Sequence, residues 1–319
     1  MLLLTDDELD RLADPPMIVS SVEAAMVWDE THPGNVPQRM HLNRGDNTYL
    51  MMPAYGPSHY GTKVVSVLPG NSFFNKPVIS GTYQLNDNKD GSVLAIMSAA
   101  KLTALRTGAI GAVAVKHLSD TNATDIGMIG CGVQARALVK MIASVRAVKR
   151  IYYYSRTKQS IESFGKEMRK SFPHVEWIAS DNISNLISSV HVVITATTSA
   201  DPVLPDRESL LMGKTFIGMG SYKTNMREFP DAVFRLAHQV LLDAPGTRYE
   251  TGDALHPVNS GIRKAEDVFT LGKILTGTRQ VTGGTKVFKS AGYALFDLFV
   301  AEAIWERAIC EQKGIEVNF

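Results

Sequence analysis

One short stretch decides the fold of this chain: Ile126-Gly127-Met128-Ile129-Gly130-Cys131-Gly132-Val133-Gln134-Ala135. Its apolar first half predicts a buried strand, and its Gly-x-Gly-x-x-Ala pattern predicts a tight turn that opens a helix. Backbone N–H groups and the helix dipole at such a turn point toward bound anions, and glycines let the backbone approach a phosphate closely. The stretch therefore predicts a dinucleotide pyrophosphate site formed by Gly130, Gly132, Val133 and Gln134.

The end of the next strand-like run, Ile151–Tyr154, indicates which dinucleotide is bound. In a dinucleotide-binding domain this point meets the adenosine ribose, where an acid favours NAD and an arginine beside small hydroxyls accommodates the 2′-phosphate of NADP. Ser155, Arg156 and Thr157 stand here and no acid does, so the sequence favours NADP(H) and leaves NAD(H) open. The alternative is a surface helix start, capped by Ser155 or Thr157 and with Arg156 solvated.

Composition narrows the class of protein. The 319 residues suffice for two domains, and 45% hydrophobic with 20% charged residues is typical of a globular chain. A net charge of +1 provides no broad basic field for nucleic acid or membrane. The segment Met1–Glu8 does not resemble a signal peptide, and no run approaches a membrane span, so we expect a cytoplasmic enzyme. Cys131, Cys310 and the scattered histidines show no metal-ligand spacing, so no metal is expected.

The middle of the chain alternates strand-like and helix-like segments. The strands are expected at Ala123–Ile129, Ile151–Tyr154, Val175–Ala179, Val190–Thr195, Thr215–Met219 and Gln239–Asp243, with helices at Gln134–Val148 and Gln159–Phe172. This alternation predicts an α/β fold, a parallel sheet with helices on both faces and ligands at the carboxyl ends of its strands. Further cofactor contacts are therefore expected from Ala196, Thr197, Thr198, Met219 and Gly220.

Residues 1–118 predict a separate α+β domain. Strand-like runs at Tyr49–Met52, Tyr60–Leu68, Ile79–Asn86 and Val93–Met97 are separated by turn residues and flanked by helices at Val22–Glu30 and Ser98–Ala114. A short strand and a capped helix are expected before them, at Met1–Glu8. The final helix, Ser290–Glu311, is expected to pack back on this domain. The expected division is therefore 1–118 with 290–319, and 119–289 for the dinucleotide-binding domain.

An ordered set of motifs resembles the ornithine cyclodeaminase/mu-crystallin family over nearly the whole chain. The motifs are Met52–Tyr55 (MPAY), Gly61–Val65 (GTKVV), Leu102–Ala109 (LTALRTGA), Gly130–Ala135 (GCGVQA) and Val287–Gly292 (VFKSAG). The resemblance implies a Rossmann NAD(P)-binding domain and a homodimer whose interface is made by the substrate-binding domain. It also implies hydride transfer at C2 of an α-amino acid or of the corresponding imine.

The resemblance assigns roles to several side chains. Lys63 lies in an apolar strand, where burial lowers the pKa of a lysine, and it matches the family lysine near the substrate carboxylate and the reacting nitrogen. Arg39 and Arg106 match carboxylate-binding arginines, and Thr107 is expected to reach a cofactor phosphate. The alternatives are an exposed strand lysine, ordinary surface arginines and a helix hydroxyl that bonds to the backbone.

The last helix carries further expectations. Ser290 and Gly292 are expected to begin it, at the place where family members close over nicotinamide and substrate, although Ser290 could equally be an ordinary helix cap. Asp297 and Glu302 are interpreted as structural and are left out of the site.

Two departures from the family pattern concern acids. Tyr222 takes the position of an aspartate that assists ring closure in cyclodeaminases, and Leu50 stands where they carry an acid before Met-Pro. Both changes favour members that only move a hydride, namely ketimine reductases and amino-acid dehydrogenases. Tyr222, Leu50 and Met52 are expected to shape the side-chain pocket together with Gly246–His256. The acids of this loop, Glu250 and Asp253, could meet a basic side chain of the substrate but are interpreted as solvated.

The sequence thus predicts an NAD(P)H-dependent oxidoreductase at the α-carbon C–N bond of an amino acid. The substrate is left open between a cyclic imine, such as pyrroline- or piperideine-2-carboxylate, and a 2-oxo acid with ammonia that gives alanine, arginine or lysine. One alternative is a cyclodeaminase that uses bound NAD and another acid. A second is a non-catalytic NADPH-binding protein, against which the joint presence of Lys63, Arg39 and Arg106 argues.

Overall fold

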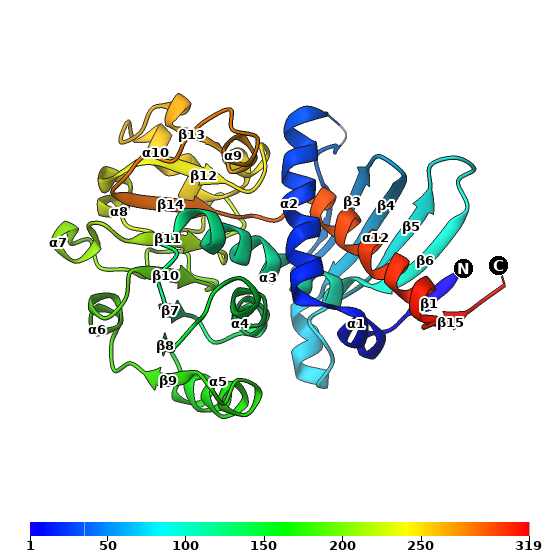
Figure 1. Cartoon of the computed structure of the whole chain (residues 1–319), viewed down its shortest axis with the longest axis horizontal. Coiled ribbons are helices and arrows are strands. Elements are labelled where there is room, and N and C mark those ends of the chain that lie inside the picture. Colours follow the sequence, from blue (N-terminus) through cyan, green and yellow to red (C-terminus); the bar gives the residue numbers. More distant parts are fainter. Residues whose placement is uncertain (35, 319) are drawn as a thin grey trace. The chain divides into compact units, whose positions relative to one another are not determined.

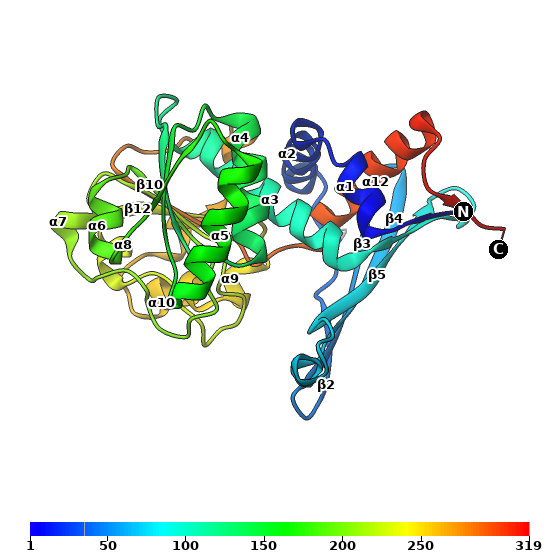
Figure 2. The ribbon, with the colours of Figure 1, turned by 90° about the horizontal axis from the view of Figure 1, so that it is seen from below.

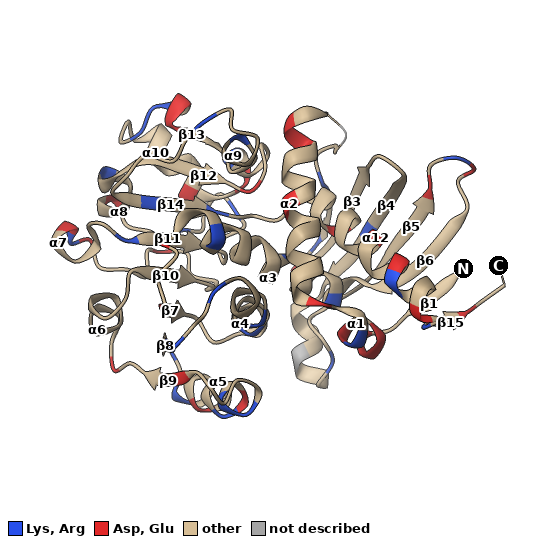
Figure 3. Ribbon diagram, viewed as in Figure 1, with Lys and Arg blue, Asp and Glu red and all other residues tan. Residues whose placement is uncertain are grey.

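The computed structural model describes residues 1–34 and 36–318, and its residues form two compact units. The first unit is Met1–Arg106 with Tyr293–Phe319, and the second is Thr107–Gly292. Each contains a sheet with helices against it, so the chain is an α/β protein, as its sequence predicts (Figure 1). Lysines, arginines and acids are interspersed along the elements of both units (Figure 3), in keeping with the small net charge.

A seven-stranded mixed sheet forms the first unit, in the order β15-β1-β6-β5-β4-β3-β2. The strands are β1 (Leu2–Leu4), β2 (Met40–Arg44), β3 (Asn47–Tyr55), β4 (His59–Val67), β5 (Ile79–Asp87), β6 (Val93–Ser98) and β15 (Ile315–Glu316). Neighbours pair antiparallel except β1 and β6, which run parallel. The sequence does not predict β2, because all of its residues are exposed and no alternation of apolar and polar positions marks it.

The helices of the first unit are α1 (Asp6–Leu12), α2 (Pro15–Thr31), α12 (Ala294–Glu311) and the first part of α3 (Ala99–Leu118), with a 3-10 turn η1 (Pro69–Phe74). A capping box opens α1, since Thr5 Oγ1 accepts from Glu8 N and Glu8 Oε2 accepts from Thr5 N. Helices α2 and α12 lie along one face of the sheet (Figures 1 and 2). Alternate residues of β4, including His59 and Lys63, are buried on that face.

An eight-stranded parallel sheet forms the second unit, in the order β13-β12-β14-β11-β10-β7-β8-β9. The strands are β7 (Asp125–Ile129), β8 (Arg150–Tyr154), β9 (Glu176–Ala179), β10 (Val192–Thr195), β11 (Thr215–Gly218), β12 (Ala237–Leu242), β13 (Val268–Thr270) and β14 (Thr285–Lys289). The expected strands are present. The sequence does not predict β13 and β14. Strand β14 lies inside the sheet, but Lys286 and Lys289 interrupt its apolar run.

Helices lie on both faces of the parallel sheet (Figure 2). They are the rest of α3, α4 (Val133–Val145), α5 (Lys158–Ser171), α6 (Ile183–Ser188), α7 (Glu208–Leu211), α8 (Asp231–Leu236), α9 (Thr247–Glu250), α10 (Gly252–Asn259) and α11 (Gly272–Leu275), with a 3-10 turn η2 (Ala265–Asp267). One core cluster lies around Phe216, Phe229 and Phe234, whose rings meet edge to face. Among the described residues, no helix combines the length and the apolar character needed to span a membrane.

The boundary between the units falls inside α3, after Arg106, whereas the sequence predicts it after residue 118. A Cβ built on Gly108 would lie 2.6 Å from the carbonyl oxygen of Ala137 in α4. The absence of a side chain at Gly108 therefore lets this part of α3 pack closely on α4, which joins it to the second unit.

Candidate functional site

Lys63 is buried near the middle of β4, on the face that the helices cover. Its Nζ donates to Asp297 Oδ2 at 2.7 Å and to Thr103 Oγ1 at 3.3 Å. Only 2% of its surface is exposed, so its ammonium group has almost no access to bulk water. The expected alternative, an exposed strand lysine, is wrong.

Asp297 joins the two predicted cations of the first unit. Its Oδ2 accepts from Lys63, and its Oδ1 accepts from Arg106 Nε at 3.1 Å. Asp297 is fully buried in α12, and Arg106 is also buried rather than on the surface. Asp297 is not among the predicted site residues, although an isolated acid in the apolar stretch Leu295–Val300 indicates a buried partner.

Burial and charge set the protonation of Lys63. The pKa of Lys63 is lowered from 10.5 to about 8, mainly because burial penalises the ammonium form. The charge of Asp297 opposes this shift of the pKa, whereas the positive charges of Arg106 and Arg39 add to it. Arg39 belongs to the same unit as Lys63 and Arg106. A lysine with such a pKa can both give and take a proton near neutral pH.

Three more polar side chains lie on the same face of the sheet. His59 Nδ1 lies 2.8 Å from Glu302 Oε1 of α12. Tyr83, opposite Lys63 in the β4–β5 register, is fully buried, and its hydroxyl has no hydrogen-bond partner among the described residues. Burial raises the pKa of Tyr83 well above 10, so this hydroxyl keeps its proton.

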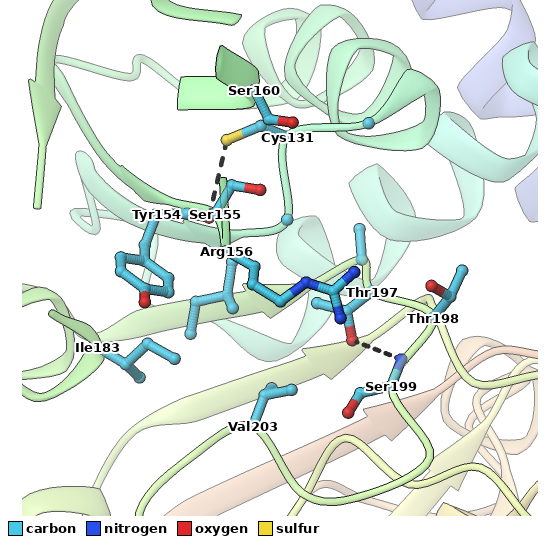
Figure 4. Close-up of a pocket in the computed structure, with 14 residues that line it drawn as sticks. Cys131, Tyr154, Ser155, Arg156, Ser160, Ile183, Thr197, Thr198, Ser199 and Val203 are labelled. Carbon is cyan, nitrogen blue, oxygen red and sulfur yellow. Dashed lines mark hydrogen bonds between the residues drawn. The ribbon is translucent and has the colours of Figure 1, made fainter. Parts of the chain in front are cut away.

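The predicted dinucleotide turn forms one wall of a cavity of about 360 Å³ in the second unit (Figure 4). The lining residues are Ile129, Gly130, Cys131, Gly132, Tyr154, Ser155, Arg156, Ser160, Ile183, Ala196, Thr197, Thr198, Ser199 and Val203. Gly130 has a φ of +103°, and a Cβ on it would lie 2.4 Å from the carbonyl oxygen of Ala196. No other residue type fits this turn without strain. These features fit a dinucleotide bound at the carboxyl ends of β7, β8 and β10.

Arg156 and Ser155 line this cavity at the end of β8, and the Arg156 side chain reaches across it toward Thr197 and Thr198 (Figure 4). Thr157 does not line it. Its hydroxyl caps α5, accepting from Ser160 N at 3.3 Å and donating to Ser160 Oγ at 2.7 Å. The alternative interpretation of a helix cap therefore holds for Thr157.

Other predicted cofactor residues lie outside the cavity lining. Val133 is exposed at the start of α4, and the next residue, Gln134, has a buried Oε1 without a partner among the described residues. Thr107 is buried in α3, and Met219 is buried after β11. Gly220, which follows, donates its N–H to Glu228 Oε2 at 2.8 Å.

Ser290 does not begin a helix, which corrects the expectation for this segment. Its hydroxyl donates to Asp243 Oδ2 at 2.6 Å, and Gly292 N donates to the same oxygen at 2.9 Å. Both residues follow β14 in the sequence and are bound to Asp243. The helix therefore starts only at Ala294, and the second unit extends to Gly292. The sequence contained no local signal for Asp243, since its partners lie far along the chain.

The residues expected around the substrate side chain belong to both units. Tyr222 is 48% exposed, with the Lys223 ammonium over its ring. Met52 is buried in β3 of the first unit, where Leu50 is partly buried. Asp253, interpreted as a solvated loop acid, is fully buried instead, and burial raises its pKa. The residues that the structure describes contain no group of three or more His, Cys, Asp or Glu side chains that could hold a metal ion.

Known proteins resemble this chain over its whole length. A Delta(1)-pyrroline-2-carboxylate reductase of Bacillus cereus is 30% identical over 328 residues, covering 100% of both chains. The solved structure of the Thermococcus litoralis Delta(1)-pyrroline-2-carboxylate reductase, in complex with NADH and L-proline, has a TM-score of 0.91 and 27% identity. It covers 99% of this chain and 100% of that one.

A second solved structure, an archaeal alanine dehydrogenase dimer with bound NAD, has a TM-score of 0.92 and 25% identity, and covers 100% of this chain and 99% of that one. The model of the ornithine cyclodeaminase/mu-crystallin family matches residues 10–312. The chain therefore belongs to the ornithine cyclodeaminase/mu-crystallin family.

Proposed function

We propose that this chain is a nicotinamide-dependent reductase of a cyclic imino acid, and that Delta(1)-pyrroline-2-carboxylate, which gives proline, is its preferred substrate class. The observation that carries the proposal is the buried cluster of Lys63, Asp297 and Arg106. It combines a group that can donate a proton with a cation suited to a carboxylate. The names of the relatives in Bacillus and Thermococcus support the cyclic imine.

In the proposed reaction the C=N bond becomes a C–N bond with one new C–H and one new N–H bond. Arg106 and Arg39 hold the substrate carboxylate and so orient C2. The ammonium group of Lys63 supplies the proton that the nitrogen needs, and Asp297 keeps Lys63 oriented. When bound, a reduced nicotinamide would supply the hydride that C2 accepts. Lys63 is then neutral and regains a proton before the next turnover.

We further propose that NADP(H) is preferred over NAD(H). The support is Arg156, an exposed cation that lines the cavity at the end of β8 beside Ser155, with no acid at that point. A guanidinium there suits a 2′-phosphate, which carries a charge that the ribose of NAD lacks. The second candidate activity is amino-acid dehydrogenation, which the archaeal alanine dehydrogenase favours.

We also propose a homodimer formed through the open face of the first sheet. Met40 and Leu42 of β2 lie opposite Met51 and Tyr49 of β3, and Met51 lies opposite Val64 of β4. All five side chains are exposed, which is an unusual apolar surface for a monomer. The archaeal dimer supports a second copy of this chain as what covers it.

The deciding experiment follows NADPH and NADH absorbance with pyrroline-2-carboxylate, piperideine-2-carboxylate, and pyruvate with ammonium. Oxidation with a cyclic imine supports the proposal, and proline with NADP⁺ then shows the reverse reaction. Turnover only with pyruvate and ammonium would assign an amino-acid dehydrogenase instead. No turnover with any of them, while the dinucleotide still binds, would favour a cyclodeaminase or a binding protein.

A further inference from the structure

Glu228 is a fully buried carboxylate in the segment between β11 and α8. Burying a carboxylate is costly unless its oxygens are satisfied by donors. Its Oε1 accepts from Thr197 N at 2.8 Å and from Thr197 Oγ1 at 2.9 Å. Its Oε2 accepts from Gly220 N at 2.8 Å and from Ser221 N at 3.2 Å. One side chain therefore ties together the segments that follow β10 and β11.

Both of these segments lie where a parallel sheet binds its ligand. Thr197 lines the dinucleotide cavity together with Gly130 and Arg156. Gly220 and Ser221 follow the neighbouring strand, at the same edge of the sheet. The four donors occupy roughly all the acceptor positions that a carboxylate has, and each oxygen serves a different segment. Only a group with two acceptor oxygens can satisfy both segments at once.

A buried cation balances this carboxylate. Lys289 of β14 is fully buried, and its Nζ lies 3.5 Å from Glu228 Oε2 and 3.8 Å from Asp253 Oδ2. Asp253 in turn accepts from Ser221 Oγ at 2.6 Å and from Glu228 N at 3.0 Å. Replacing a buried ion pair by apolar residues often leaves stability unchanged or improved. A gain in stability therefore does not explain why charged groups are buried here. The need to hold the segments after β10 and β11 in one fixed arrangement does explain them.

We infer that Glu228 is a positioning residue for the nicotinamide dinucleotide, which it serves by holding the segments after β10 and β11 in the shape that binds the cofactor. Glu228 lines no part of the cavity and acts through Thr197, Gly220 and Ser221. Lys289 compensates the negative charge of Glu228, and Asp253 holds Ser221 by accepting from its hydroxyl. The inference rests on the dinucleotide site of the proposed function.

The test is Glu228→Gln in the full chain, because the amide keeps the size but turns one acceptor into a donor. An N–H group of one segment then faces an NH₂ group and loses its acceptor. We expect the Kd of NADPH, and its KM, to rise about tenfold or more. The KM of the imino acid should change less than about threefold, because Arg39 and Arg106, which are proposed to hold its carboxylate, belong to the first unit, whereas Glu228 and its hydrogen-bond donors belong to the second. Glu228→Asp keeps the charge but shortens the reach, so it should weaken NADPH binding as well.

Lys214→Met is the matched control. Lys214 Nζ donates to Val190 O at 2.6 Å, before β10 and β11 begin, so the variant loses a buried hydrogen bond at the other end of the same strands. It should lower Tm and leave the Kd of NADPH unchanged. If Glu228→Gln and Glu228→Asp lower Tm with no change in the Kd of NADPH, the inference is overturned. Binding of NADPH to the unaltered protein is measured first, by NADPH fluorescence. Binding without turnover would be a failure of the proposed reaction, whereas an unchanged Kd in the Glu228 variants would be a failure of this inference.

Discussion

Lys63 Nζ and Asp297 Oδ2 lie 2.7 Å apart in a pair to which bulk water has almost no access. Lys63 belongs to β4 and Asp297 to α12, at opposite ends of the chain. An opposite charge at this distance normally raises the pKa of a lysine, yet burial and two arginines lower it to about 8. This balance keeps a proton available close to neutral pH.

Replacing Lys63 by alanine should remove the proton donor and leave the cofactor site intact. Turnover with a cyclic imine should fall by about 10²–10⁴-fold, the usual contribution of a general acid. Binding of NADPH, followed by fluorescence, should be unchanged because the dinucleotide cavity lies within the second unit. An unaltered rate would remove Lys63 from the mechanism.

The pKa of Lys63 predicts opposite pH dependences for the two directions. Imine reduction needs the ammonium form, so kcat/KM should be constant below pH 8 and fall about tenfold per unit above it. Amino-acid oxidation needs the neutral amine, so its kcat/KM should rise with pH and level off above about 8. Initial rates across this pH range in both directions check this, and parallel profiles would contradict it.

Asp297→Asn should shift the pH dependence of imine reduction toward lower pH. The charge of Asp297 raises the pKa of Lys63, so its removal leaves burial and the arginines unopposed and the pKa drops below about 8. The reductive rate should then begin to fall at a lower pH. Glu302→Gln is the control, since Glu302 bonds to His59 and is not a cause of the Lys63 shift. Coincident profiles for wild type and Asp297→Asn would exclude the coupling.

Arg156→Ala should weaken NADPH far more than NADH. Loss of a charged hydrogen bond to the 2′-phosphate should raise the Kd of NADPH about 10- to 100-fold, with less than about threefold for NADH. Lys158→Ala is the control, because Lys158 is a nearby exposed cation outside the cavity lining. Equal losses for the two cofactors would exclude Arg156 as the 2′-phosphate ligand.

Leu42→Lys should split the proposed dimer into monomers. Leu42 is 68% exposed on the apolar sheet face, and burying an ammonium group there opposes association. Met212→Lys is the control, because Met212 is similarly exposed but lies in the second unit. Light scattering on the eluting protein gives the mass, and a dimer that survives Leu42→Lys would exclude this face as the interface.

Local patterns in the sequence were sufficient for much of the fold. The Gly130 turn, the alternating strands and helices of residues 123–243 and the capped first helix all follow from periodicity and turn chemistry, which act over a few residues. The same patterns predict that several loops meet at one site, because parallel strands end at one edge of their sheet. In the structure one cavity is lined by Gly130, Gly132, Ser155, Arg156 and Thr197.

Other features depended on partners that no local pattern reveals. Strand β14 has no clear sequence signal, because its Lys289 is tolerated inside the sheet only beside Glu228 and Asp253. Ser290 was expected to begin or cap a helix, whereas its hydroxyl donates to Asp243, which lies far away in the sequence.

The sequence by itself determined the parallel sheet, the dinucleotide turn and the set of cations, since each is encoded by neighbouring residues. Only the tertiary structure decided how Asp297 pairs Lys63 with Arg106, and how far burial lowers the Lys63 pKa. The physical reason is that a pKa and a buried ion pair depend on distance and desolvation in space, which arise only when distant segments pack together.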